Sequence, residues 1–262
     1  MCDIFVNLKR FEVPRKFGGV CPENDPILWI KNVIHSCRQL GLAKRNDIRL
    51  VFFVPEGLIY AAASSADGAF LIGSQGVFRE NISPSGNFGA FTTNLPAVAA
   101  KNLGCTWSII GHSEERQDKF GIMSAFAPEI AENPRIASKA QSAVNSLINQ
   151  EVLQALQSGL NVLLCIGETA EERGVGPLTE QKKRIKKVLR TQLVEGLRGV
   201  SKYLPAREIV IGYEPIWAIG PGKTPPDRDY ISFVAKLIKD LVYAEFRIPI
   251  NVVYGGGLRK EN

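Results

Sequence analysis

The chain has 262 residues, of which 45% are hydrophobic and 22% are charged. This balance is typical of a globular protein and leaves room for one large α/β domain. No run of 18 apolar residues occurs, and the first residues lack the hydrophobic region of a signal peptide. We therefore expect a cytoplasmic protein with no membrane partner.

The net charge of +6 is compatible with nucleic acid or with a small anionic substrate. The densest basic run, residues 182–187, lies within a helical pattern and has no interleaved aromatic residues. We expect this run to be a solvated helix face, with no nucleic-acid partner. The five cysteines form no Cys-x-x-Cys pair, which predicts reduced thiols, no disulfide framework and no metal site.

Short β-rich runs alternate with helical patterns along the chain. The predicted strands are residues 4–8, 49–54, 69–74, 106–111, 161–167, 208–213 and 250–254. The clearest helical patterns are residues 27–40, 147–157, 179–197 and 228–246. Gly41, Gly104 and Gly159 stand where C-terminal helix caps belong. Because the strand runs are apolar throughout, we expect burial on both faces and hence a parallel sheet.

The positions of polar residues distinguish the two architectures that are built from repeated βα units, an open sheet and a barrel. Polar residues lie at or closely after the ends of several predicted strands: Asn7, Lys9, Gln75, His112, Glu168 and Glu214. In a (β/α) barrel these strand ends meet at one mouth, which is the active-site face. An open sheet would concentrate them at one switch point and usually show Gly-x-Gly-x-x-Gly after its first strand, which is absent here. The sequence therefore predicts an α/β barrel.

Glu214 ends the sixth predicted strand and precedes a loop of small residues that we call the lid, residues 215–225. A buried strand would hold the carboxylate in a fixed place, and the Gly-Pro-Gly segment at 220–222 can offer backbone N–H groups to an anion. This layout suits a general base under a closing loop. The alternative is an ordinary strand–loop–helix connection, in which Glu214 is a solvated strand end.

His112 follows the fourth predicted strand and precedes a helix start, which we expect Ser113 to cap. The N–H groups and dipole of that helix would disfavour an imidazolium, so we expect a neutral imidazole that exchanges protons with a substrate oxygen. A satisfied core histidine is the alternative. The other histidine, His35, lies within the first helical pattern and is expected to be structural or solvated.

Lys9 and Asn7 lie two residues apart on one face of the first predicted strand. A lysine at a barrel mouth requires an anion or a carboxylate as a partner, and Glu114 and a phosphorylated substrate are both candidates. A base, a neutral electrophile, a cation and glycine loops together suit proton abstraction next to a carbonyl on a phosphorylated sugar. Lys9 and His112 would stabilise the enediolate.

These motifs together resemble the triosephosphate isomerase family, in its order and at its strand ends, from residue 4 to about residue 258. They are Asn7-x-Lys9, Ile-Gly-His-Ser-Glu at 110–114, Cys-Ile-Gly-Glu at 165–168, Tyr-Glu-Pro-Ile-Trp-Ala-Ile-Gly at 213–220 and Tyr-Gly-Gly at 254–256. The resemblance implies a single-domain (β/α)8 TIM barrel over residues 1–262.

The resemblance also implies the residue roles. Glu214 is the catalytic base, and His112 and Lys9 are the neutral and cationic electrophiles. The substrate-binding residues are Asn7, Lys9, Gly220, Gly256 and Gly257, and the supporting residues are Glu114, Ser113 and Tyr254. The Gly220 N–H would bind the phosphate when the lid closes. Neither a metal nor an organic cofactor is expected.

Two residues depart from the family pattern. Gly257 stands where the family usually has a serine that contacts phosphate and latches the lid, and Pro225 stands where an alanine offers its N–H to the tyrosine at position 254. Two missing hydrogen bonds of about 1 kcal/mol each would shift the lid equilibrium by about tenfold or more. Pro221 would offset part of this effect by restricting the open loop.

The chain is also longer than the family norm at about residues 121–143, where we expect a surface elaboration or an altered subunit contact. The family's third loop, residues 76–89 here, inserts into a partner subunit, so a homodimer is expected. Seven strands are predicted where the family has eight, and the family's eighth strand and closing helix are not present. Because seven strands would leave two unpaired edges, we expect the natural protein to continue past Asn262.

The leading functional hypothesis is interconversion of D-glyceraldehyde 3-phosphate and dihydroxyacetone phosphate, a step of glycolysis and gluconeogenesis. Gly257 and the altered lid keep a second hypothesis open, an aldose–ketose isomerase of a four-carbon tetrulose phosphate. A catalytically weakened barrel with a binding role is the third hypothesis.

Overall fold

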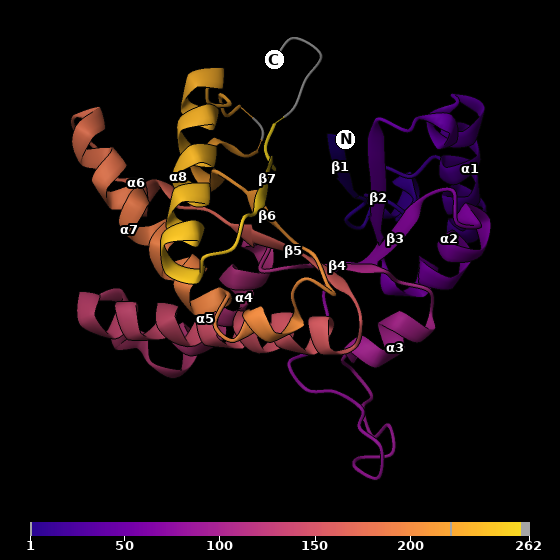
Figure 1. Ribbon diagram of the computed structural model, residues 1–262, viewed down its shortest axis with the longest axis horizontal. Coiled ribbons are helices and arrows are strands. Elements are labelled where there is room, and N and C mark those ends of the chain that lie inside the picture. The colour runs from indigo at the N-terminus through magenta and orange to yellow at the C-terminus, as the bar shows by residue number, and fades with distance from the viewer. Residues whose placement is uncertain (1, 221, 258–262) are drawn as a thin grey trace. The chain divides into compact units, whose positions relative to one another are not determined.

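The computed structural model describes residues 2–220 and 222–257. Within these ranges, helices follow strands in alternation for most of the chain (Figure 1). The strands are β1 (Cys2–Asn7), β2 (Ile48–Val54), β3 (Leu71–Ser74), β4 (Trp107–Ile110), β5 (Asn161–Ile166), β6 (Ile209–Tyr213) and β7 (Asn251–Tyr254). The α-helices are α1 (Pro26–Gln39), α2 (Ile59–Ala66), α3 (Ala97–Asn102), α4 (Ser113–Phe126), α5 (Pro134–Gln157), α6 (Ala170–Arg173), α7 (Leu178–Gly196) and α8 (Arg228–Phe246).

The chain divides into two compact units, residues 1–109 with 154–162 and residues 110–153 with 163–262. In the first unit, β1, β2, β3 and β4 follow one another in chain order, and the pairs are parallel. In the second unit, β5, β6 and β7 also follow chain order, and β6 pairs with β7 in parallel. Parallel strands in chain order are the expected result of repeated βα units.

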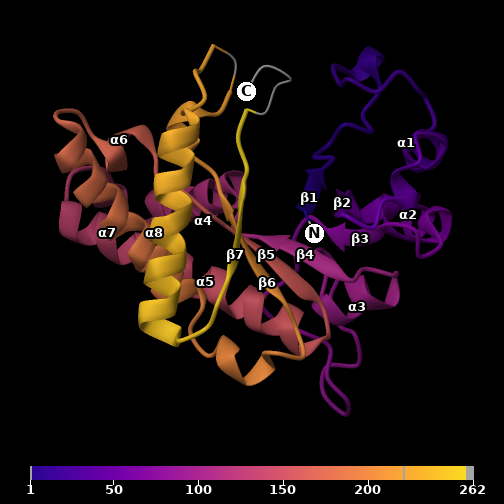
Figure 2. The ribbon, with the colours of Figure 1, turned by 45° about the horizontal axis from the view of Figure 1, so that its top comes forward.

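Aromatic side chains fill the core of the first unit. Phe5 stacks on Phe53 at 5.9 Å between ring centroids and meets the edge of Trp107 at 5.1 Å. Phe53 and Trp107 are fully buried. Gly73 leaves room for the Phe53 ring, since a Cβ at this position would lie 2.5 Å from a ring carbon. Figure 2 shows α1 and α2 beside these strands. Helix α1 packs on α2 and buries Ile30 and Ile34, and α2 packs on β3 and buries Ile59 and Ala62.

In the second unit, α7 and α8 pack against each other, and α8 also packs on β7 (Figure 1). Both helices bury residues at a spacing of four: Ile185, Leu189 and Leu193 in α7, and Val234, Ile238 and Val242 in α8. All five residues of β6 are buried, as expected for a parallel strand that is covered on both faces.

The structure confirms the seven predicted strands, with bounds that shift by up to two residues at each end. It also confirms the helix at 228–246 with its predicted bounds, and Gly41, Gly104 and Gly159 follow helix ends with φ values of +74°, +104° and +85°. The helix predicted at 147–157 ends where it was predicted to end, but it begins earlier, at Pro134. Residues 121–143 form the end of α4, a 3-10 helix at Pro128–Ala131 and the start of α5.

None of the helices in the described ranges is long and apolar enough to cross a membrane. The extent of the domain as a single body over residues 1–262 stays a prediction.

Candidate active site

His112 lies at the junction of β4 and α4, where it is the N-cap residue of the helix. Its Nδ1 accepts a hydrogen bond from the Glu114 N–H at 3.4 Å. The prediction that Ser113 caps this helix is therefore wrong, because Ser113 is already the first helical residue and the ring takes the capping position. Since Nδ1 must present its lone pair in order to accept, the proton of the neutral ring is on Nε2.

Glu214 follows β6 directly, and its backbone is held against β5. Its N–H donates to the carbonyl of Ile166 at 2.8 Å. Gly167 permits this approach, since a Cβ there would lie 1.7 Å from the Glu214 carbonyl oxygen. Only 7% of Glu214 is exposed, so the prediction of a solvated strand end can be set aside. The strand delivers a buried carboxylate to a fixed position.

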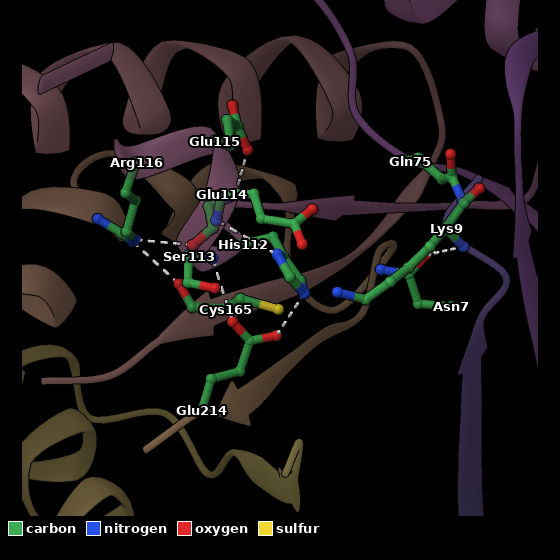
Figure 3. A network of polar contacts seen from close by, with 11 residues as sticks. Asn7, Lys9, Gln75, His112, Ser113, Glu114, Glu115, Arg116, Cys165 and Glu214 are labelled. Atoms are coloured by element: carbon green, nitrogen blue, oxygen red, sulfur yellow. Dashed lines mark hydrogen bonds and ion pairs between the residues drawn. The ribbon is translucent and has the colours of Figure 1, made fainter. Parts of the chain in front are cut away.

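The carboxylate of Glu214 meets both His112 and the start of α4 (Figure 3). Its Oε1 lies 3.2 Å from His112 Nε2, and its Oε2 accepts from the Ser113 N–H at 3.2 Å. Burial raises the pKa of Glu214, and the nearby His112, Cys165 thiol, Ser113 N–H and Arg116 offset this only in part. A carboxylate with a raised pKa is a stronger base than an ordinary glutamate.

Lys9 and Asn7 form a second polar group at the end of β1, together with Gln75 from the end of β3. Lys9 has a φ of +44°, a left-handed conformation that is uncommon for a lysine. The Lys9 N–H donates to Asn7 Oδ1 at 2.9 Å. Gln75 Nε2 donates to the Lys9 carbonyl at 2.8 Å and to Asn7 Oδ1 at 3.1 Å. Gln75 thus clamps the turn that presents Lys9.

Sequence reasoning placed Gln75 at a strand end without assigning it to the site. The signal that could have assigned Gln75 to the site is its position at the end of β3, because Asn7 and His112 also lie at the ends of their strands. The clamp itself depends on a contact between residues 66 positions apart, which no local pattern reveals. Glu114 lies on the first turn of α4 with its side chain exposed, and its proposed pairing with Lys9 stays a prediction.

The beginning of the lid is anchored on Glu168, a carboxylate that is fully buried just after β5. Its Oε1 accepts hydrogen bonds from Tyr213 Oη at 2.9 Å, Trp217 Nε1 at 2.8 Å and Tyr230 Oη at 3.3 Å. The Arg173 guanidinium lies 3.8 Å from the centre of the Trp217 ring, a cation–π contact. Glu168 was predicted to lie at a strand end and within a family motif, but this anchoring role was not predicted.

The middle of the lid turns at Gly220, whose carbonyl accepts from the Lys223 N–H at 3.2 Å. Gly220 has a φ of +118° and is exposed. The prediction for Pro221 lies outside the described residues.

The loop after β7 passes close to Tyr254. A Cβ at Gly256 would lie 2.1 Å from Tyr254 Oη, so a larger residue here would force the Tyr254 ring to move. The Tyr254 hydroxyl is buried and has no hydrogen-bond partner among the described residues. A Cβ at Gly257 would lie 3.2 Å from Pro225 Cγ, which places this loop in contact with the end of the lid. The unpartnered hydroxyl is what the loss of an N–H at position 225 would produce.

The residues described here include no group of three or more His, Cys, Asp or Glu side chains that could hold a metal ion. In the second unit, the Glu214 carboxylate, the His112 imidazole and the Ser113 N–H lie together, and such a set is suited to proton transfer. Lys9, which carries the ammonium group, belongs to the first unit.

Comparison with known proteins first defines the class of fold. The structure is similar to a crystal structure of triosephosphate isomerase from Bartonella henselae, with a TM-score of 0.66 and 21% sequence identity, over 100% of this chain and 85% of that chain. The chain therefore has the (β/α)8 TIM-barrel fold that the sequence predicted.

The family follows from sequence. The family model for triosephosphate isomerase matches residues 29–262, and the chain belongs to this family of isomerases. The triosephosphate isomerase of Moorella thermoacetica is 32% identical over 212 residues, which cover 79% of this chain and 70% of that protein. That of Geobacter metallireducens is 32% identical over 224 residues, or 84% of this chain and 74% of that protein. The predicted family is confirmed.

Proposed function

We propose that the protein interconverts D-glyceraldehyde 3-phosphate and dihydroxyacetone phosphate by proton transfer through an enediolate. The observation that supports this most directly is the contact between His112 Nε2 and Glu214 Oε1 at 3.2 Å. It pairs a buried base with a ring whose other nitrogen is already an acceptor, so the ring has one proton to donate.

In the proposed reaction, the Glu214 carboxylate removes a proton from the carbon next to the substrate carbonyl and returns it to the neighbouring carbon. As the first C–H bond breaks, its electron pair forms the carbon–carbon double bond of the enediolate. The carbonyl oxygen gains negative charge and takes the Nε2 proton of His112. The His112 ring then takes the proton of the neighbouring hydroxyl, whose oxygen becomes the new carbonyl as Glu214 returns the carbon-bound proton. Because 3.2 Å leaves no space between His112 and Glu214, the substrate must replace this hydrogen bond when it binds.

Lys9 supplies the positive charge in this proposal. Its left-handed turn and the Gln75 clamp support a fixed presentation of the ammonium group, since strained backbone conformations occur often at functional sites. Asn7 contacts the substrate, and the N–H groups of Gly220, Gly256 and Gly257 bind the phosphate. We propose a homodimer that forms through the loop at 76–89, and a cytoplasmic location.

Coupled assays with the two substrates test the proposal. We expect a kcat/KM for the triose phosphates that exceeds the value for a tetrulose phosphate by at least about tenfold. A preference of that size for the longer sugar would favour the second candidate, which Gly257 and the altered lid motivate. Absence of turnover with both sugars, together with tight binding of a phosphorylated enediolate mimic, would favour a barrel with a binding role.

A further inference from the structure

The two peptide groups that flank Gly111, the residue directly before His112, are both held by side chains of α4. Its N–H donates to Glu115 Oε2 at 2.7 Å, and its carbonyl accepts from Arg116 Nε at 2.7 Å. Gly111 has a φ of +77°, and a Cβ there would lie 2.9 Å from the Arg116 guanidinium. The residue that leads into His112 is therefore fixed in a single tight turn. Figure 3 shows Glu115 and Arg116 beside His112.

Arg116 connects this turn to its surroundings. It is 6% exposed, and it also donates to Asn145 Oδ1 on α5 at 2.7 Å and to the Cys165 carbonyl on β5 at 2.9 Å. The guanidinium of Arg116 has three acceptors and links the Gly111 turn to β5 and α5. Its role is that of a general support for the fold.

Glu115 is held by a more specific set of contacts. Lys119, one turn further along α4, lies 2.6 Å from Glu115 Oε1 and 3.0 Å from Glu151 Oε1. Glu151 lies on α5 and is only 4% exposed. Burial opposes the ionisation of Glu115, but Glu151, Lys119 and the Gly111 N–H together outweigh it and lower the pKa of Glu115. The carboxylate that accepts from Gly111 is thus kept charged and in place.

We propose that Glu115 is a positioning residue for His112: by accepting from the Gly111 N–H, it fixes the Gly111 backbone turn that sets the direction of the His112 ring. The capping bond from the Glu114 N–H to Nδ1 is long, at 3.4 Å, and leaves the ring some freedom by itself. The fixed Gly111 turn supplies the remaining restraint, so that Nε2–H faces the base. The restraint of the His112 ring is inferred from the geometry alone. The expected effect on kcat also rests on the proposed function.

The chain offers a direct spectroscopic test because it contains only two histidines, His112 and His35. Nitrogen-15 NMR of the ring nitrogens reports the tautomer and the hydrogen bonding of each ring, with His35 as an internal reference. The variants are Glu115→Ala, which removes the acceptor, and Glu115→Gln, whose amide oxygen can still accept from the Gly111 N–H. Glu180→Ala, which removes an exposed acid from the first turn of α7, is the matched control.

We expect Glu115→Ala to shift the His112 ring signals, leave those of His35 unchanged and lower kcat by about tenfold or more, with KM changed less than about threefold. Glu115→Gln and Glu180→Ala should keep the parent signals and a kcat within about threefold of the parent. If Glu115→Ala does not fold, Glu115→Asp, which withdraws the carboxylate by one methylene, should shift the His112 signals in the same way.

Two results would overturn the positioning role. One is a folded Glu115→Ala protein, or Glu115→Asp in its place, with parent His112 signals. The other is a change in the His112 signals that is as large in Glu115→Gln as in Glu115→Ala, because loss of the hydrogen-bond acceptor at position 115 would then not explain the change. A parent protein that isomerises no phosphosugar would remove the proposed function, and the NMR comparison would still decide whether Glu115 positions the ring.

Discussion

Replacing Glu214 by glutamine separates the contribution of this residue to catalysis from its contribution to stability. The carboxylate accepts two hydrogen bonds, from the Ser113 N–H and from His112 Nε2–H, each at 3.2 Å. Glutamine has the same shape but only one accepting oxygen, so its NH2 group must face one of these donors. The variant therefore loses the base and one hydrogen bond.

The two losses differ in size. A missing hydrogen bond costs about 0.5–1.5 kcal/mol of folding free energy, and removing a carboxylate whose charge is disfavoured by burial offsets part of that cost. We expect the free energy of unfolding to change by less than about 1 kcal/mol. Loss of the base should lower kcat by about 10²–10⁴, which corresponds to about 2.7–5.5 kcal/mol of activation free energy.

The assay is steady-state turnover in both directions, combined with urea unfolding of the same preparation. Glu180→Gln on the exposed face of α7 is the control for a change from glutamate to glutamine, and it should alter neither quantity. A well-folded Glu214→Gln protein with the parent kcat would refute the assignment of Glu214 as the base.

Three further predictions concern the Lys9 turn, the loop at Gly257 and the buried carboxyl group of Glu151. Replacing Gln75 by alanine should release the Lys9 turn and lower kcat/KM by about tenfold, as measured by steady-state kinetics; an unchanged value would show that the clamp is dispensable. Gly257→Ser should tighten inhibition by a phosphorylated enediolate mimic, and more so when Pro225→Ala removes the 3.2 Å contact; weaker inhibition in the double variant would contradict this account. Burial and the neighbouring Glu115 raise the pKa of Glu151 to about 9, so the folded state binds a proton that the unfolded state releases above about pH 4.5. The free energy of unfolding should then fall between about pH 4.5 and 9, by at most about 1.4 kcal/mol per pH unit, and Glu151→Gln should flatten this slope in urea unfolding.

The parts of the fold that the sequence predicted well are those with strong local patterns. The helix at 228–246 was predicted with its observed bounds because its apolar residues recur every three to four positions and Asp227 caps its start. The strands were visible as apolar β-branched runs. The first half of α5 was missed because residues 134–146 are rich in Ala, Ser, Asn and Gln, which leaves a weak apolar stripe.

The site residues that were missed depend on contacts between distant segments. The pairing of His112 with Glu214 spans 102 positions, and the strand ends alone indicated that both lie at a barrel mouth. An imidazole at the N-cap is unusual, so the sequence favoured Ser113, whose hydroxyl is a common cap. Gln75, Glu115 and Glu168 act through hydrogen bonds to other polar groups of the site region, and each of these bonds depends on tertiary geometry.

A crystal structure with a phosphorylated enediolate mimic would test the central claim most directly. The account predicts that Glu214 Oε, His112 Nε2 and Lys9 Nζ all lie within about 3.2 Å of the two-carbon unit or its oxygens, with His112 no longer bonded to Glu214. A mimic that contacts Glu214 and His112 while Lys9 faces a separate cavity would contradict it.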